Sequence, residues 1–176
     1  MSIENKRRET LFTREDIQKR TEELGKELSD FYKDKNLLVV SLLKGSFIFT
    51  ADLVRELSIP VRIEFMTTSS YGHGEESTGS VKVVQDLNVD LSEYDVLIVD
   101  DIIDSAITMT GVIEHLKKKN PKSVKSCALL DKPERRRVAY DGDFIGFTIP
   151  DMFIVGYGLN YGDYYRNIPY VFAFVD

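Results

Sequence analysis

The sequence predicts an α/β fold: an open, mainly parallel sheet with helices on both faces, to which the C-terminal segment adds a small hood. The first reason is that strand-sized segments such as Leu37–Leu43 are almost continuously apolar, which is typical of strands covered by helices on both sides. The second is that such segments alternate with stretches of helical periodicity. A length of 176 residues, without an internal repeat or a linker, favours a single domain over residues 1–176.

The first predicted element is a helix that begins after the N-cap residue Thr13 and has Asp16 in its first turn. Its apolar face consists of Ile17, Leu24, Leu28 and Phe31. The segment Leu37–Leu43 is too short for a helix and is predicted to be a strand buried on both faces. It ends at Lys44-Gly45-Ser46, and a second helix follows to about Leu57.

Pro60 ends the second helix, and Val61–Met66 alternates between apolar and polar residues like a strand. Val81–Gln85 is predicted to be the strand that returns beside it. Residues 67–80 lie between these two strands and contain three glycines and many hydroxyl groups. Because long loops in compact domains are usually functional, we expect a mobile loop with a role in function.

The remaining predicted strands are Asp95–Val99, Ser123–Leu130, Phe153–Val155 and Tyr170–Val175. A third helix precedes Pro121, and its inner face consists of Met109, Val112, Ile113 and Leu116. Lys117–Lys119, near the end of this helix, suit the helix dipole. In open sheets of this kind, ligands collect beyond the carboxyl ends of the strands.

Composition disfavours several classes of protein. The formal net charge is −6, which weakens a nucleic-acid interpretation, and no apolar segment approaches the ~20 residues of a membrane span. The first ten residues contain no apolar segment, so we expect no secretory signal. The single cysteine, Cys127, excludes an internal disulfide framework and a cysteine zinc cluster. We expect a cytoplasmic protein with neither a nucleic-acid nor a membrane partner, in which Arg135–Arg137 form a solvated turn rather than an RNA contact.

Three unusual segments follow predicted strands: Lys44-Gly45-Ser46, Asp100–Ser105 and Asp131-Lys132-Pro133. In the second, three carboxylates fall within five residues and repel each other, which usually indicates a cation or a hydroxylated ligand. Ser105–Thr108 then leads into a helix, whose N-terminal amides and two hydroxyls can bind an anion. Together these groups suit a ribose phosphate. The alternative is a solvated acidic turn in which a hydroxyl caps the helix.

The acidic segment also carries a family resemblance: Val96–Thr108 resembles the phosphoribosyl-pyrophosphate (PRPP) binding motif of type I phosphoribosyltransferases. Four other segments, in the same order along the chain, are similar to those of bacterial hypoxanthine-guanine phosphoribosyltransferases: Leu43–Ser46, Ser69–Gly72, Leu130–Arg135 and Ile149–Leu159. The resemblance covers essentially the whole chain after the first helix. It implies the type I phosphoribosyltransferase fold, and a reaction in which a purine base and PRPP form a nucleotide and pyrophosphate with Mg²⁺.

The resemblance also implies roles for the residues around the sugar and the phosphate. Asp100 and Asp101 would bind the ribose 2′- and 3′-hydroxyls, directly or through Mg²⁺, and Asp104 would be the general base that faces N7 of the purine. The 5′-phosphate would be enclosed by Asp104, Ser105, Ala106, Ile107, Thr108 and Met109.

Further roles concern the pyrophosphate. Lys44 and Gly45 would hold it, with a non-proline cis peptide bond expected just before Lys44, and Arg166 would contact it as well. Ser70 and Tyr71 would cover the site when the long loop closes.

For the purine, the resemblance implies that Lys132 hydrogen-bonds the 6-oxo group, that Phe153 stacks on the base, and that the Ile154 backbone contacts its edge. Position 160 would lie at a second metal ion.

The chain departs from the family pattern at three positions. Asp100 replaces a glutamate, which keeps the charge and shortens the reach. Ala106 replaces a glycine, and if that residue needs a positive φ its methyl group costs about 1 kcal/mol or more. Asn160 replaces an aspartate and lacks its negative charge, which predicts weaker binding of metal and PRPP.

Two classes of function stay open at this point. A salvage enzyme that makes IMP and GMP is favoured, because a lysine at position 132 suits a 6-oxopurine and disfavours adenine, although a xanthine-preferring enzyme fits as well. The other class is a nucleotide-sensing regulatory protein on the same fold; Ala106 and Asn160 leave it open, while the net charge and the retained Asp104 stand against it. The family also implies a homodimer or homotetramer.

Overall fold

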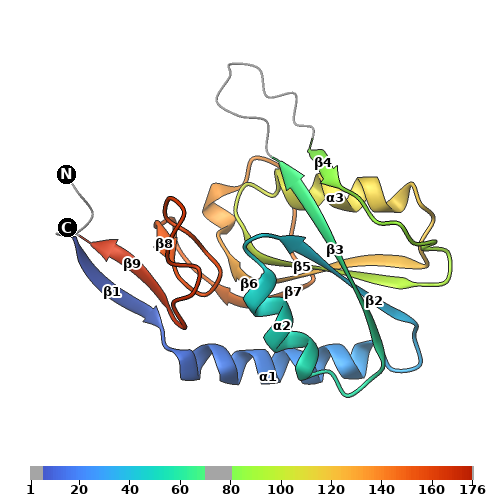
Figure 1. Cartoon of the computed structure of the whole chain (residues 1–176), viewed down its shortest axis with the longest axis horizontal. Coiled ribbons are helices and arrows are strands. Elements are labelled where there is room, and N and C mark those ends of the chain that lie inside the picture. Colours follow the sequence, from blue (N-terminus) through green and yellow to red (C-terminus); the bar gives the residue numbers. More distant parts are fainter. Residues whose placement is uncertain (1–5, 70–80, 176) are drawn as a thin grey trace.

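The computed structural model describes residues 6–69 and 81–175, and its main feature is a six-stranded sheet in the order β4-β3-β2-β5-β6-β7 (Figure 1). The strands are β2 (Leu37–Leu43), β3 (Val61–Ser69), β4 (Lys82–Gln85), β5 (Asp95–Ile103), β6 (Ser123–Asp131) and β7 (Phe144–Thr148). All neighbours pair in parallel except β4, which is antiparallel to β3. The predicted α/β class and the return of β4 beside β3 are therefore confirmed.

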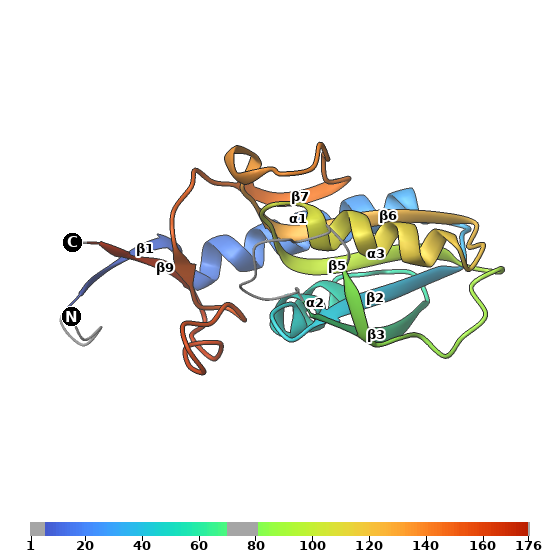
Figure 2. The same cartoon turned by 90° about the horizontal axis from the view of Figure 1, so that it is seen from above.

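Helices cover both faces of this sheet, as predicted. They are α1 (Arg14–Phe31), α2 (Phe47–Arg55) and α3 (Ile107–Lys117). Leu97 and Val99 of β5 pack in the cluster of α1 and α2, while Val96 and Ile98 pack in the cluster of α3, because successive strand residues point to opposite faces. Figure 2 shows α3 and α1 on opposite sides of the sheet. Among the described residues, no helix combines the length and apolarity that crossing a membrane requires.

The start of α1 agrees with the prediction in detail. The Thr13 hydroxyl accepts the Asp16 N–H at 3.1 Å, and the Asp16 carboxylate accepts the Thr13 N–H at 2.9 Å, which forms a capping box. The prediction that Phe31 belongs to the buried face is wrong, because its side chain is 41% exposed. The next residue, Tyr32, is fully buried and takes the inner position at this end of the helix.

A second, three-stranded antiparallel sheet forms the hood, and the chain builds it differently from the prediction. Its order is β1 (Arg7–Phe12), β9 (Val171–Val175) and β8 (Ile154–Val155). The segment Phe153–Val155, predicted as a buried strand like those of the parallel sheet, instead contributes the short β8 to the hood; the unpredicted β7 is the last strand of the main sheet. The hood also contains β1, so both ends of the described chain build it.

The connections diverge from the middle of the main sheet. The chain runs from β2 to β3 in one direction and from β5 through β6 to β7 in the other, which makes the boundary between β2 and β5 a topological switch point. Pairing between β2 and β5 ends at Ser41 and Val99, while β5 continues beside β6 as far as the pair Ile103 and Asp131. The last residues of β5 therefore have a strand neighbour on one side only.

Ala106, the residue before α3, has the left-handed conformation that was predicted to be costly, with φ +66° and ψ 2°. That conformation costs a non-glycine residue about 1–2 kcal/mol. The methyl group is 3% exposed and packs in the core beside α3, which returns about 0.8 kcal/mol of apolar burial.

These opposing contributions predict that Ala106→Gly leaves the free energy of unfolding within about 0.5 kcal/mol of the wild type. The matched control is Ala51→Gly on the exposed side of α2, where the same change in a helix interior costs about 1 kcal/mol. Urea denaturation of the three proteins measures both values. An equal loss at the two positions would contradict backbone strain at Ala106.

Candidate functional site

Two adjacent carboxylates occupy the end of β5, at the switch point. Asp100 and Asp101 are half-buried, and the Asp101 N–H donates to the Asp100 carboxylate at 2.9 Å. Burial, followed by the charge of Asp101, raises the pKa of Asp100 well above its usual range. Burial also raises the pKa of Asp101, although the charge of Arg166 acts in the opposite direction. This edge is therefore electrostatically suited to a cation or to hydroxyl donors.

A cavity of about 240 Å³ opens beside these carboxylates. It is lined by residues 100–106 together with Thr108 and Met109, so it connects the end of β5 with the first turn of α3. The Ser105 hydroxyl accepts the Ile107 N–H at 3.3 Å, and the next amides belong to the helix N-terminus. First-turn amides have no acceptor within their own helix, so they can bind an anion. The structure thus brings the carboxylates and the first-turn amides together, as predicted.

The turn after β2 closes one side of the site. The peptide bond between Leu43 and Lys44 is cis, which confirms the expectation, and Lys44 is exposed. Gly45 lies directly against Asp101: a Cβ atom at this residue would be 1.9 Å from the Asp101 carboxylate. A side chain at residue 45 would therefore have to displace the Asp101 carboxylate from its position.

The hood closes the same side. A Cβ atom on Gly158 would be 2.1 Å from the Gly45 carbonyl oxygen, and Gly158 has a φ of +98°. The Arg166 guanidinium donates to the Gly158 carbonyl at 2.6 Å, and the Gly158 N–H donates to the Arg166 carbonyl at 2.9 Å. The fold thus gathers Lys44, Gly45, Asp101 and Arg166 from the end of β2, the end of β5 and the hood.

Three buried hydroxyls support the turn after β2 from below. The Ser41 hydroxyl is 2.8 Å from those of both Ser46 and Thr50, and the Ser46 hydroxyl donates to the Leu42 carbonyl at 2.6 Å. Sequence reasoning did not identify this network. The feature that could have indicated it is Ser41, the lone polar residue within an otherwise apolar strand.

Lys132 follows β6 and forms the opposite side of the site. Its side chain is 7% exposed, and within the described residues its ammonium group has no hydrogen-bond or ion-pair partner. The Lys132 N–H donates to the Ile103 carbonyl at 2.9 Å, which places it beside Asp104. An ammonium group that has no protein acceptor, at the end of a largely buried side chain, is suited to an acceptor on a ligand.

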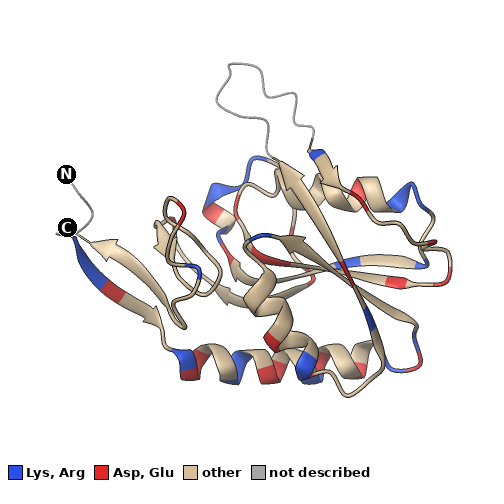
Figure 3. Ribbon diagram, in the orientation of Figure 1, with Lys and Arg blue, Asp and Glu red and all other residues tan. Residues whose placement is uncertain are grey.

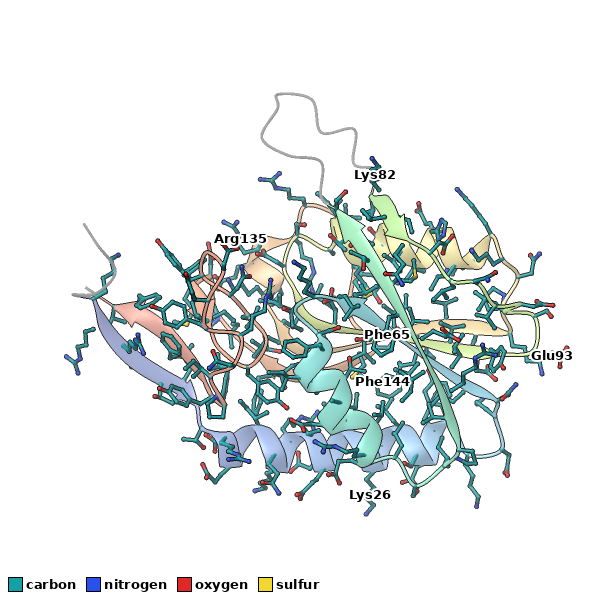
Figure 4. All side chains as sticks on the ribbon, in the orientation of Figure 1. Lys26, Phe65, Lys82, Glu93, Arg135 and Phe144 are labelled. Atoms are coloured by element: carbon teal, nitrogen blue, oxygen red, sulfur yellow. The ribbon has the colours of Figure 1, made fainter. Side chains whose placement is uncertain are left out.

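The segment of Phe153 is held near Asp104 by Arg135. The Arg135 guanidinium lies 3.3 Å from the Asp104 carboxylate and 3.5 Å from that of Asp151, and Figure 4 shows this arginine on the side of the main sheet that faces the hood. The Phe153 ring is 56% exposed and contacts the edge of Tyr161 at a centroid distance of 5.5 Å. Ile154 is buried in β8. An exposed aromatic ring therefore lies in the segment that Arg135 links to Asp104.

The turn Arg135–Arg137 is solvated only in part. Arg135 and Arg137 are exposed, as predicted, but Arg135 ends the short 3₁₀ helix η2 (Pro133–Arg135) and pairs with two carboxylates, and the Arg136 side chain is only 14% exposed. Because three arginines follow one another in the sequence, nothing in it distinguished Arg136, which makes many largely buried contacts. Figure 3 shows acidic and basic residues interspersed along α1, in contrast to the clustered basic surface of a nucleic-acid binder.

The structure does not bring three of the predicted site residues, Ser70, Tyr71 and Asn160, into this arrangement. Ser70 and Tyr71 lie outside the described residues. Asn160 is exposed, and its amide donates to the Gly162 carbonyl. A larger cavity of about 430 Å³ lies between α1, α2 and the hood, and it includes Asp52 and Tyr157 but none of the predicted site residues.

The carboxylate pair predicts a pH-dependent cost in stability. Above pH ~4 the unfolded chain has released protons that the native chain still binds, so the free energy of unfolding falls as the pH rises towards the raised native pKa. Asn at position 100 keeps an oxygen for the Asp101 N–H and removes one charge. We expect metal-free Asp100→Asn to melt about 2–4 °C above the wild type at pH 7 and to show no advantage at pH 3.

The control for this measurement is Asp90→Asn. Hydrogen bonds from the Ser92 backbone and side chain lower the pKa of Asp90, so its replacement brings no gain at pH 7. An equal rise in melting temperature for Asp100→Asn at both pH values, or a rise for the control, would show that the burial and repulsion of charge at the end of β5 are not the cause.

Comparisons with known proteins agree with this arrangement. A family model described as "Phosphoribosyl transferase domain" matches residues 8–162. The chain is 47% identical to the hypoxanthine-guanine phosphoribosyltransferase of Aquifex aeolicus over 175 residues, which is 99% of this chain and 98% of that protein.

Solved structures give the same result. A hypoxanthine phosphoribosyltransferase from Staphylococcus aureus has a TM-score of 0.91 at 41% identity and covers 95% of this chain and 91% of its own. A Trypanosoma cruzi hypoxanthine phosphoribosyl transferase, solved in work on the role of its C-terminal region in oligomeric state and activity, has a TM-score of 0.90 at 40% identity, with coverage of 95% and 91%. The chain therefore belongs to the hypoxanthine-guanine phosphoribosyltransferase family, within the phosphoribosyl transferase domain proteins.

Proposed function

We propose that the protein transfers the 5-phosphoribosyl group from PRPP to hypoxanthine or guanine, giving IMP or GMP and pyrophosphate in purine salvage. The observation that carries this proposal is Lys132, a residue only 7% exposed whose ammonium group has no protein partner in the described part of the chain, next to Asp104 and on the same side of the sheet as the segment of the exposed Phe153 ring. An ammonium group donates hydrogen bonds and accepts none. It therefore suits the 6-oxo group of these bases and disfavours the 6-amino group of adenine.

The end of β5 supplies the groups for the phosphoribosyl moiety. The loop that precedes α3 and the first turn of that helix, from Asp104 through Ser105, Ala106, Ile107, Thr108 and Met109, bind the 5′-phosphate with their amides and hydroxyls. Asp100 and Asp101 bind the ribose hydroxyls. Cleavage at C1 of the ribose passes through an oxocarbenium-like state, and carboxylates on the sugar side stabilise the positive charge that develops there.

The purine lies between three groups in this proposal. Phe153 stacks on one face, the Ile154 backbone contacts the edge, and Lys132 donates to the 6-oxo oxygen. Asp104 is the catalytic base that accepts the N7 proton as the new bond forms. The Arg135 guanidinium lies 3.3 Å from this carboxylate and fixes its position beside the purine segment.

Pyrophosphate leaves towards the turn after β2. Lys44 and the Gly45 amide hold it from one side, and Arg166 balances its charge from the hood. Ser70 and Tyr71 cover the site, which protects the cationic sugar from water.

Magnesium fits the donor set at the end of β5. The described residues contain no cluster of three His, Cys, Asp or Glu side chains, but Mg²⁺ is usually bound by one or two carboxylates together with substrate phosphates. Asp100 and Asp101 would hold it, with the side-chain oxygen of Asn160 at a second position, and it would neutralise charge on the leaving pyrophosphate. Burial and the charge of Asp101 raise the pKa of Asp100 when no cation is bound. A cation between the two carboxylates would offset this cost, which supports the proposed role of the pair.

The test is a turnover assay with PRPP and Mg²⁺ that offers hypoxanthine, guanine, xanthine and adenine in parallel. We expect turnover of hypoxanthine or guanine, and a loss of about 10²–10⁴-fold in kcat for Asp104→Asn with IMP binding retained. Xanthine as the best substrate would identify a xanthine-preferring enzyme. No turnover of any base, while GMP or UMP still raises the melting temperature, would favour the nucleotide-sensing protein.

The neutral side chain at position 160 predicts a weak metal response. Asn160→Asp adds a carboxylate, so we expect it to lower the Mg²⁺ concentration for half-maximal activity by about tenfold, which corresponds to about 1.4 kcal/mol. Asn88→Asp adds the same charge at a distant exposed position and is the control. An unchanged half-saturation point in Asn160→Asp, or an equal shift in the control, would refute a metal-facing role.

We also propose that residues 1–176 act as a single domain whose partners are the purine base, PRPP and further copies of itself. Ile63 and Phe65 are 37% and 45% exposed on one face of β3, which would suit contact with a second copy in a homodimer or homotetramer. The cytoplasmic location expected from the sequence stays a prediction.

A further inference from the structure

Arg136 makes more hydrogen bonds than a residue in a surface turn needs. Its guanidinium donates to the carbonyl oxygens of Asp104 at 2.8 Å, Ile103 at 3.1 Å, Lys132 at 3.3 Å and Tyr140 at 2.9 Å. It also pairs with the carboxylate of Asp131. Both charged side chains are largely buried, with exposures of 14% for Arg136 and 12% for Asp131.

Apart from Tyr140, the acceptors belong to two different parts of the proposed site. Ile103 and Asp104 end β5 and begin the loop that binds the 5′-phosphate, while Asp131 and Lys132 end β6 and hold the purine. Main-chain bonds join the same two segments, from the Lys132 N–H to the Ile103 carbonyl at 2.9 Å and from the Arg137 N–H to the Ser105 carbonyl at 3.0 Å. One side chain therefore bridges the two segments that must contact opposite ends of a nucleotide.

The planar guanidinium group is suited to this task. It presents five N–H donors in a rigid fork, so it can satisfy several carbonyls and a carboxylate at fixed relative positions. A lysine at the same position keeps the charge opposite Asp131 but has three donors on a flexible stem. Arg136→Lys therefore loosens the bridge without leaving a buried carboxylate unpaired, a loss that would be strongly destabilising.

We propose that Arg136 is a positioning residue that fixes the distance and orientation between the 5′-phosphate loop and the purine-binding segment. This inference rests on the proposed function. A nucleotide occupies both segments at once, so the second contact forms at a high effective concentration only if the segments are correctly spaced. A misplacement of about 1 Å in such an arrangement can reduce function about 100-fold.

Arg136 is expected to affect the binding of a whole nucleotide more than the binding of its ribose-phosphate half. IMP reaches both segments, whereas ribose 5-phosphate reaches only the phosphate loop and the β5 carboxylates. Calorimetric titration of Arg136→Lys is expected to show IMP binding weakened by about 10- to 100-fold and ribose 5-phosphate binding changed by less than about threefold. Arg137→Lys is the matched control, because the Arg137 side chain is exposed and only its main chain contacts the loop.

A residue that merely supported the fold would weaken both ligands equally, and equal weakening would overturn the inference. Unchanged binding of both ligands would overturn it as well. If Arg136→Lys does not fold, Asp131→Asn keeps an acceptor for Arg136 while removing the charge that orients it, and a smaller loss selective for IMP is expected. Failure of the wild-type protein to bind IMP would instead refute the proposed function on which the inference rests.

Discussion

Asp100 and Asp101 place two like charges on consecutive, half-buried residues, and the surrounding structure is arranged around that pair. β5 extends beyond its pairing with β2, so Asp101 has no strand neighbour on that side. The space is filled by Gly45, where any side chain would collide with the Asp101 carboxylate. The hood then adds a positive charge, Arg166, which lowers the pKa of Asp101 against the effect of burial. The native chain thus keeps an unfavourable charge arrangement that a cation and a sugar can relieve.

The hood is able to deliver Arg166 because both ends of the described chain stabilise it. β9 is the middle strand, paired with β1 on one side and with β8 on the other. The Arg8 guanidinium of β1 lies 5.2 Å from the ring centroids of both Tyr165 and Phe172, so the residue next to Arg166 is packed against the N-terminal strand. The position of Arg166 therefore depends in part on a strand at the far end of the sequence.

Most of the main sheet could be predicted because β2, β5 and β6 are each defined by an apolar run, although β7 was missed, and the end of the sheet that carries the candidate site could be located because parallel strands end together. A hood from the C-terminal segment could be predicted as well, but two of its strands could not, since β1 is largely charged and exposed and β8 has only two residues. Both strands exist only through pairing with β9, which local periodicity does not reveal. Arg136 was missed for a related reason: three consecutive arginines look equivalent in sequence, and only the fold distinguishes the buried one.

The charged groups of the candidate site come from several helices, strands and loops, so no single element carries all of them. The carboxylates and the first-turn amides belong to β5 and α3, whereas Lys44, Lys132 and Arg166 come from the end of β2, the end of β6 and the hood. The pair of neighbouring, half-buried carboxylates is unfavourable in the free protein. Under the proposed function, a ligand with an oxo group at one end and a phosphorylated sugar at the other contacts the Lys132 ammonium group and this pair at once. Its binding then depends on the spacing of the two segments, which the guanidinium of Arg136 joins between β5 and β6.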